Sequence, residues 1–237
     1  MSSPPCVLVT GASSGIGAAT ARRFLSAGWE VAALARRQEL LGALGREHPG
    51  RTLALAADLT RTDAVAAAAA QLAAWRAQLA AVVFCAGDFF VRPMELTTDA
   101  DFERLWRLTV WSRFALTRAL LPLLGAGGGH PPRVVIHLAS LAVHRDFPDE
   151  TAYTSALHGV IGLARAQDAE LRQRGVRVSV ISPGTVRTPL TERSFPPEAL
   201  AGALAPEAIA ESVHFLVATL RAGGYIPEIF HVPQNST

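Results

Sequence analysis

The segment Thr10-Gly-Ala-Ser-Ser-Gly-Ile-Gly17 directly follows the apolar run Cys6-Val-Leu-Val9 and precedes an amphipathic stretch. This order predicts a buried strand, a glycine-rich turn and a helix. The free backbone N–H groups of such a turn lie at the positive end of the helix, where a pyrophosphate binds. Gly11 would permit the tight turn, Gly15 would let the backbone approach the phosphates, and Gly17 would let helix and strand pack closely. We therefore expect a bound dinucleotide at this turn.

The composition narrows the class of protein. The chain has 237 residues, 50% of them apolar, which is enough to bury a substantial core as one large α/β domain or two small ones. Its 22 basic residues are interspersed with 20 acidic ones, so a basic stripe for nucleic acid is not expected. Charged residues interrupt the apolar runs before they reach membrane-spanning length, and the first residues lack the pattern of a secretory signal.

Cysteine and lysine usage add two further observations. The two cysteines, Cys6 and Cys85, open and close neighbouring predicted strands, so they lie at opposite ends of the sheet and cannot form a disulfide. This favours a reducing, cytoplasmic setting. Every one of the 22 basic residues is an arginine, and the single asparagine is Asn235. The lack of lysine bears on the catalytic site below.

Short β-rich runs alternate with helical segments along the whole chain, a pattern typical of a parallel sheet covered on both faces. The predicted strands span residues 6–10, 30–35, 52–58, 81–86, 133–140, 176–182 and 225–229. The predicted helices span residues 16–27, 38–47, 61–78, 98–124, 152–174 and 206–220. No repeat or linker divides the chain, so we expect one doubly wound α/β domain over residues 1–237, with a seven-stranded parallel sheet.

Five segments resemble a known family. They are Thr10-Gly-x-x-x-Gly15-x-Gly17, Asp58 after the third predicted strand, Ala86-Gly87 after the fourth, Ser140 with Tyr153 thirteen residues later, and Pro183-Gly184-x-Val186-x-Thr188. In this order they resemble the short-chain dehydrogenase/reductase family over nearly the whole chain. The resemblance implies a Rossmann fold, with Asp58 at the adenine ring and segment 183–188 beside the nicotinamide.

The end of the second predicted strand indicates which cofactor is bound. An acidic residue there would bind the ribose 2′-hydroxyl and repel a 2′-phosphate, but this strand ends in Arg36 and Arg37. The planar fork of arginine suits a phosphate monoester, so NADP(H) is favoured over NAD(H). The alternative is that both arginines only solvate the next helix, with Glu39 paired to one of them. The candidate cofactor-binding residues are Thr10, Gly11, Ser13, Ser14, Gly15, Ile16, Gly17, Arg36, Arg37, Asp58, Leu59, Ala86, Gly87, Pro183, Gly184, Val186 and Thr188.

The resemblance makes Tyr153 the general acid/base and Ser140 the residue that orients the carbonyl oxygen. The family's lysine, four residues after the tyrosine, is replaced here by Leu157, and Thr109 stands where the family has an asparagine. The family's asparagine before Ala-Gly is likewise replaced, by Cys85. An unassisted phenol, with a pKa of roughly 10, donates a proton near pH 7 but is a poor base. A surviving activity should therefore favour reduction.

Three side chains could compensate for the missing lysine. Arg113 lies one helical turn after Thr109, His144 follows Ser140 by four residues, and His158 is adjacent to Leu157. For each of them, an ordinary surface or packing role is the alternative.

Two classes of function stay open at this point. One is an NADP(H)-dependent dehydrogenase/reductase that acts on a small carbonyl or alcohol substrate and favours reduction, and the other is a cofactor-binding protein that has lost turnover and serves as a sensor or partner subunit. The resemblance also implies a homodimer or homotetramer that pairs helices 98–124 and 152–174. A stripe of leucines on the first of these helices would face either a partner or the sheet: Leu105, Leu108, Leu116 and Leu120.

Overall fold

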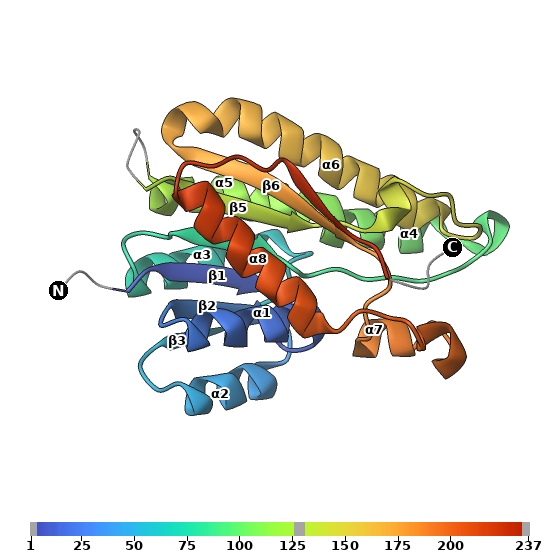
Figure 1. Cartoon of the computed structure of the whole chain (residues 1–237), viewed down its shortest axis with the longest axis horizontal. Helices are drawn as coiled ribbons and strands as arrows, with labels where there is room; N and C mark the ends of the chain where they lie inside the picture. Colours follow the sequence, from blue (N-terminus) through green and yellow to red (C-terminus); the bar gives the residue numbers. More distant parts are fainter. Residues whose placement is uncertain (1–3, 126–130, 234–237) are drawn as a thin grey trace.

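Seven parallel strands form the centre of the computed structural model, which describes residues 4–125 and 131–233 (Figure 1). Their order is β3-β2-β1-β4-β5-β6-β7, so the chain winds outward from β1 and then crosses back to start again at β4. The strands are β1 Cys6–Thr10, β2 Glu30–Ala35, β3 Thr52–Ala56, β4 Ala81–Phe84, β5 Arg133–Leu138, β6 Val176–Pro183 and β7 Glu228–His231. The doubly wound parallel sheet predicted from the sequence is confirmed.

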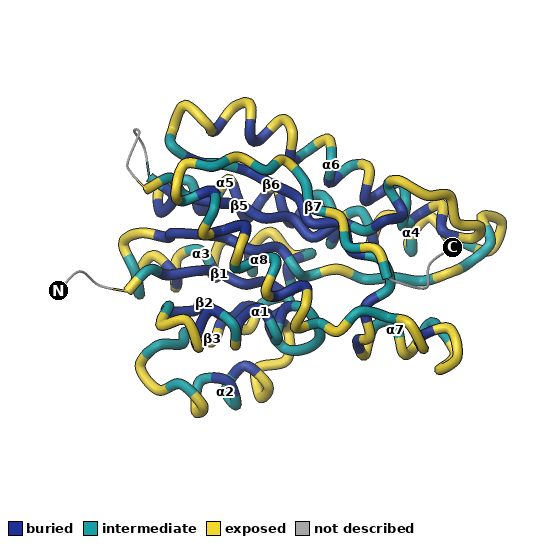
Figure 2. Tube along the Cα trace, viewed as in Figure 1, coloured by how far each residue is buried: buried dark blue, intermediate teal, exposed yellow. Residues whose placement is uncertain are grey.

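Helices cover both faces of this sheet and divide the core into two layers. On one face lie α1 Gly15–Ser26, α2 Gln38–Glu47 and α8 Pro206–Arg221, whose apolar side chains pack on the sheet around Val7, Val9 and Val83. On the other face lie α3 Thr62–Trp75, α5 Ser112–Leu124 and α6 Thr151–Leu171, which pack around Leu8, Val82 and Val135. Alternate residues of one strand thus belong to opposite layers, which is why the central strands are mostly apolar and buried (Figure 2).

The helix predicted over residues 98–124 is interrupted. It begins as α4 Asp99–Trp106, passes through a π-helical turn at Arg107–Trp111 and continues as α5. In the turn that follows, the Ser112 hydroxyl donates a hydrogen bond to the Leu108 carbonyl. Such a turn inserts one residue into an otherwise regular helix, and it recurs at functional sites. Apolar periodicity does not report a single inserted residue, so the sequence predicted one unbroken helix.

The structure also corrects the predicted start of the last strand and decides which way the leucine stripe faces. The last strand was predicted over residues 225–229, but β7 begins only after Pro227, which lacks the N–H that a strand residue donates. Of the predicted leucine stripe, Leu105, Leu116 and Leu120 are fully buried inside the chain, so they belong to its core. The remaining bounds agree with the prediction to within a few residues at each end.

Several smaller features complete the fold. The helix α7 Pro189–Glu192 lies beyond the carboxyl ends of the strands, where Figure 1 places it apart from the two helical layers. Short 3-10 helices span Met94–Leu96, Leu141–Val143, Arg172–Arg174 and Pro197–Leu200. Both cysteines are free thiols. Over the described ranges, none of the helices has the length and apolar character needed to cross a membrane.

Candidate active site

The glycine-rich turn connects β1 to α1 at the point where the strand order reverses. Gly11 has a φ of 68°, and a Cβ at this position would lie 2.9 Å from the backbone nitrogen of Ala86. A Cβ at Gly17 would lie 2.3 Å from the Gly11 carbonyl oxygen, closer than any real contact. Both positions therefore require glycine. The Ser14 side chain makes no hydrogen bond to the first turn of α1, and that turn has no acidic residue. Residues 14–17 line the adjoining cleft, so this end of the helix is available to an anion there.

The hydroxyl of Thr10 fixes this turn to the neighbouring strand. Thr10 is fully buried, and its Oγ1 accepts hydrogen bonds from the backbone N–H groups of Cys85 at 3.1 Å and Ala86 at 3.0 Å. Thr10 was predicted to bind the cofactor, but it does not line the cleft. Its hydroxyl instead holds the backbone of Cys85 and Ala86, which do line the cleft.

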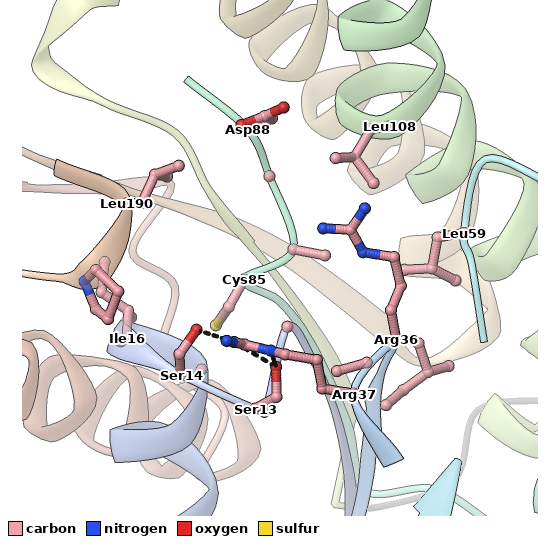
Figure 3. Close-up of a pocket in the computed structure, with 18 of the residues that line it drawn as sticks. Ser13, Ser14, Ile16, Arg36, Arg37, Leu59, Cys85, Asp88, Leu108 and Leu190 are labelled. Carbon is pink, nitrogen blue, oxygen red and sulfur yellow. Dashed lines mark hydrogen bonds between the residues drawn. The ribbon is translucent and has the colours of Figure 1, made fainter. Parts of the chain in front are cut away.

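A cleft of about 590 Å³ extends from the turn along the carboxyl ends of β1, β2 and β4 (Figure 3). The predicted cofactor residues that line it are Gly11, Ser13, Ser14, Gly15, Ile16, Gly17, Arg36, Arg37, Asp58, Leu59, Ala86, Gly87 and Thr188. Pro183, Gly184 and Val186 are not part of its wall. The Gly184 backbone N–H instead donates to the His231 carbonyl at 2.7 Å, and Val186 is buried.

Other residues of the cleft wall were not predicted. They are Leu34, Ala35, Ala57, Thr60, Cys85, Asp88, Arg104, Leu108, Pro189, Leu190 and Arg193. Most of them adjoin a predicted residue at the carboxyl end of a strand, so their position along the chain was a usable signal. Arg104 and Leu108 come from α4 and the π-helical turn, and nothing in the sequence pattern indicates that these side chains reach the cleft.

The two arginines after β2 have different surroundings. Arg37 donates to Ser13 Oγ at 2.9 Å and to Ser14 Oγ at 2.6 Å, so it lies across the glycine-rich turn. Arg36 extends instead toward Leu59 and Leu108, as Figure 3 shows, and makes no hydrogen bond or ion pair with any described residue. Glu39 forms no ion pair with either arginine in the described part of the chain. Both arginines are exposed and line the cleft, but their side chains extend to different parts of its wall.

Asp58 lies beside Arg36 on this wall. Burial opposes ionisation of its carboxyl group, but hydrogen bonds from the Thr60 backbone N–H at 2.9 Å and the Thr60 hydroxyl at 2.8 Å outweigh it. Together with the nearby charges of Arg36 and Arg61, they hold the pKa of Asp58 below its usual value. Asp58 is thus a charged acceptor at neutral pH.

Ser140 and Tyr153 meet at the carboxyl end of β5. Ser140 caps the short helix Leu141–Val143 and accepts a hydrogen bond from the Ala142 backbone N–H at 3.2 Å. Tyr153 comes from the first turn of α6, and its ring packs edge-on against Phe89, with 4.7 Å between ring centroids. Burial raises the pKa of the Tyr153 phenol to about 12, although its interaction with the Ser140 hydroxyl acts in the opposite direction. The phenol is therefore a proton donor near neutral pH.

Of the three positions at which the sequence differs from the family pattern, Leu157 and Thr109 are buried and Cys85 is partly exposed. Leu157 is 3% exposed and packs into the core cluster beneath α6. Thr109 is 2% exposed and lies within the π-helical turn, where its hydroxyl has no hydrogen-bond partner among the described residues. Neither side chain provides a charge beside Tyr153.

The three proposed compensating residues have separate environments. His144 Nε2 lies 3.1 Å from a Glu228 carboxylate oxygen, and the imidazole contacts Phe230 edge-on. His158 is exposed, and its Nδ1 lies 2.9 Å from the Thr154 carbonyl oxygen of its own helix. Arg113 alone is buried, at 3% exposure, and it interacts electrostatically with Tyr153. The structure therefore places only Arg113 near the predicted general acid.

The residues present fit a nicotinamide dinucleotide. The turn leaves no room for a Cβ at Gly11 or Gly17, and it joins a helix end without an acidic residue. Its cleft lies at the switch point of a parallel sheet, where such folds bind ligands. Within the described residues no group of His, Cys, Asp and Glu side chains is arranged to hold a metal ion.

Known proteins resemble the chain in sequence. The family described as short chain dehydrogenase matches residues 5–199. The 3beta-hydroxysteroid dehydrogenase of Mediterraneibacter gnavus is 32% identical over 192 residues, a match that covers 79% of this chain and 68% of that protein.

Solved structures resemble it in fold. The closed form of a serine dehydrogenase complexed with NADP+ superposes with a TM-score of 0.89 and 26% identity, covering 98% of this chain and 96% of that one. The 3-ketoacyl-(acyl-carrier-protein) reductase of Brucella melitensis, complexed with NADH, gives a TM-score of 0.87 and covers 98% of this chain and 97% of its own. At 23% identity, the second likeness shows the fold alone.

Proposed function

The chain belongs to the short-chain dehydrogenase family of oxidoreductases, and on this premise we propose that it is an NADP(H)-dependent reductase of a small carbonyl substrate. The observation that carries this proposal is the pairing of Tyr153 with Ser140 at the carboxyl edge of the sheet. A partly buried phenol that stays protonated near neutral pH is suited to donate a proton rather than to accept one. Reduction is therefore the favoured direction.

The reaction balances with these two side chains. The reduced nicotinamide would supply a hydride to the carbonyl carbon. Ser140 would donate a hydrogen bond to the carbonyl oxygen, and Tyr153 would transfer its phenolic proton to that oxygen as negative charge develops on it. The product is an alcohol, and the tyrosine phenolate recovers a proton from solvent. In the reverse direction the phenolate must form first, which the pKa of about 12 makes unfavourable.

Arg36 and Arg37 support the phosphorylated cofactor. Both arginines are exposed and line the cleft, and neither forms an ion pair with a described acidic residue. Arg36 would meet the ribose 2′-phosphate as a free donor, while Arg37 would meet it from its position across Ser13 and Ser14. One solved structure of the same fold holds NADP+ and another holds NADH, so the two arginines carry this part of the proposal.

The substrate would lie against aromatic side chains. Phe89 contacts Tyr153 on one side and Phe195 on the other, with 5.4 Å between the two phenylalanine ring centroids. This wall favours a small molecule with an apolar group beside its carbonyl or alcohol carbon.

A second function is favoured by two specific residues. Leu157 cannot bind the nicotinamide ribose, and Thr109 lacks the amide of the family's asparagine. A chain with these replacements could hold the cofactor without turning it over, as a sensor or partner subunit. The two functions differ in one observable, which is whether bound NADPH is oxidised.

We also propose that residues 1–237 act as one domain, and that the protein is a cytoplasmic homodimer or homotetramer. Phe102 of α4 and Phe114 of α5 are 39% and 45% exposed, which leaves apolar surface on these helices for a second copy.

Tyr153→Phe tests the proposed function. We expect NADPH to bind both the native chain and the variant, as measured by the change in NADPH fluorescence. A screen of small aldehydes and ketones should show turnover that the variant loses by about 100-fold or more, because the proton donor is gone. Tyr225→Phe removes the other tyrosine and should leave turnover unchanged. Binding without turnover of any carbonyl would favour the second function, and full activity of Tyr153→Phe would exclude Tyr153 as the acid.

A further inference from the structure

Arg113 is a buried cation without a counter-ion. Its side chain projects from α5 into the interior, and the residue is only 3% exposed. One guanidinium nitrogen donates to the Leu138 carbonyl at 2.8 Å, while Nε has no hydrogen-bond partner among the described residues. No carboxylate of the described chain lies within ion-pair distance of it. Burial lowers the pKa of Arg113 to about 10, so the group is still protonated at neutral pH.

An uncompensated buried charge destabilises a fold, because the ion loses its hydration. An arginine in this position therefore needs an explanation other than stability. The titratable groups that interact with it are Cys85, Tyr153 and His137. Burial raises the pKa of Cys85 and of Tyr153 to about 12 and lowers the pKa of His137 to about 3, so all three are neutral near pH 7. Of the three, Tyr153 is the group that would become negative during the proposed reaction.

The position of Arg113 relative to Tyr153 follows from the topology. The Leu138 carbonyl that holds the guanidinium is at the end of β5, two residues before Ser140. Tyr153 approaches the same strand end from α6, while Arg113 approaches it from α5. The guanidinium lowers the pKa of Tyr153, and a Tyr153 phenolate would in turn raise the pKa of Arg113.

No other described side chain supplies this positive charge. Leu157 is apolar and buried, His158 faces outward, and His144 contacts Glu228. The chain contains no lysine.

We propose that Arg113 is a positioning residue for the reaction, whose buried guanidinium stabilises the Tyr153 phenolate from the α5 side in place of a charge from position 157. This inference rests on the proposed function, because the phenolate forms only when Tyr153 exchanges a proton with a substrate. Arg113 touches neither substrate nor cofactor in this role. It acts through the charge of the tyrosine, and in a desolvated site that interaction is stronger than in water.

The other groups around Tyr153 also shift the pKa of its phenol, and the direction of each shift can be tested. Ser140 favours the phenolate through its hydroxyl, whereas Glu150, at the start of α6, opposes it by its negative charge. Burial raises the pKa of Glu150 to about 7, so this carboxyl group is largely ionised only above neutral pH. Arg113 and Glu150 therefore act on Tyr153 in opposite directions, from two different helices.

The test uses the fact that the chain has only two tyrosines. In a Tyr225→Phe background, a fluorinated tyrosine incorporated at Tyr153 is more acidic than tyrosine, and its fluorine NMR signal reports ionisation without substrate or cofactor. Arg113→Met, which keeps the length of the side chain without its charge, should raise the midpoint of this titration by about one pH unit. Arg113→Lys should restore the midpoint, and Glu150→Gln should lower it.

A kinetic measurement on the unlabelled protein completes the test. At pH 9, alcohol oxidation by Arg113→Met should fall about tenfold in kcat, because fewer molecules carry the phenolate, while KM for NADP+ stays within about twofold. Carbonyl reduction should change less. The thermal midpoint should not fall, since the variant removes an uncompensated buried charge.

The outcomes separate this inference from the proposed function. A fluorine titration that does not respond to Arg113→Met, or that Arg113→Lys fails to restore, overturns the role of Arg113 even if the enzyme is active. If the titration responds as expected but no carbonyl is turned over, the electrostatic assignment holds and the proposed function fails. A loss of activity accompanied by a lower thermal midpoint and an unchanged titration would make Arg113 a purely structural residue.

Discussion

The cleft at the glycine-rich turn and the region around Ser140 and Tyr153, the proposed catalytic edge, both lie at the carboxyl ends of the strands, yet they depart from the family pattern to very different degrees. Around the turn at residues 10–17, every family position is occupied by the expected residue, and the geometry allows nothing larger. Around Tyr153, the lysine position is Leu157 and the asparagine position is Thr109. The first region binds mainly through its backbone, whereas the second acts through side chains.

This difference explains why the fold tolerates the changes in the second region. A Cβ added at Gly11 or Gly17 would collide with neighbouring backbone atoms, which cannot move away without distorting the turn. A side chain at the end of a strand can be exchanged for an apolar one that packs, as Leu157 does, without moving the backbone. The family's fold is therefore retained more strictly than its chemistry.

The largest effect is expected from the turn. Gly17→Ala would place a methyl group 2.3 Å from the Gly11 carbonyl oxygen, so the turn must move. We expect NADPH affinity to fall by about 100-fold or more, equivalent to about 2.7 kcal/mol. Unfolding should become easier by about 1–3 kcal/mol, the usual cost of forcing extra atoms into a packed site. NADPH fluorescence titration and denaturant unfolding would measure the two effects.

A glycine in an open position provides the matched control. Gly45 lies in α2 with no atom within 4 Å of an added Cβ, so Gly45→Ala should leave NADPH binding unchanged. It should stabilise the protein by about 0.5–1 kcal/mol, because alanine favours a helix interior. Equal binding losses in both variants would contradict the contrast between the turn and the rest of the fold.

A smaller effect is expected from the arginines of the cleft. Arg36→Ala combined with Arg37→Ala should weaken NADPH by about 10- to 100-fold, since charge-assisted hydrogen bonds to the 2′-phosphate are lost. NADH lacks this phosphate and should lose less than about threefold. Arg46→Ala, at the far end of α2, serves as the control because it is an exposed arginine outside the cleft. Equal losses of NADPH and NADH would remove the argument for NADP(H).

The smallest effect should come from restoring the family's lysine. In the native chain, Leu157→Lys adds a second buried cation near the one that Arg113 already provides, so alcohol oxidation at pH 9 should change by less than about threefold. In an Arg113→Met background the same substitution should increase oxidation by about tenfold, because the charge beside Tyr153 is then absent. Steady-state kinetics of the four chains measures this dependence. A large gain in the native background would show that the catalytic edge lacks a charge.

Much of the fold was predictable because the sequence repeats a pattern of apolar strand followed by amphipathic helix. The turn at residues 10–17, together with the alternation of strands and helices, predicted the parallel sheet and its two covered faces. The π-helical turn at Arg107–Trp111 was not predicted, since one inserted residue leaves the apolar pattern nearly unchanged. The start of β7 was predicted too early because the apolar pattern of residues 225–229 does not show that Pro227 lacks the N–H group a strand residue donates.

The site was predictable only in part. Residues adjoining strand ends, such as Arg36 and Asp58, could be placed because parallel strands all end at one edge of the sheet. Arg104 and Leu108 reach the cleft from a helix, and Arg113 lies in the interior, where an arginine is not expected. Its spacing from Thr109 suggested a shared helix face, but burial without a counter-ion depends on packing among α5, β5 and α6. The roles of Ser140 and Tyr153 stay predictions.

The hydroxyl of Thr10 also limits how the backbone around the cleft can move. By accepting both backbone N–H groups that follow β4, it joins the phosphate turn to the strand end leading toward Phe89 and the reacting edge. These two hydrogen bonds, of about 3 Å each, hold the two backbone segments in a fixed relative position, so both halves of a bound dinucleotide would contact one rigid part of the fold. The segment around α7, which carries Thr188 and Leu190 into the cleft, lies outside this pair of hydrogen bonds.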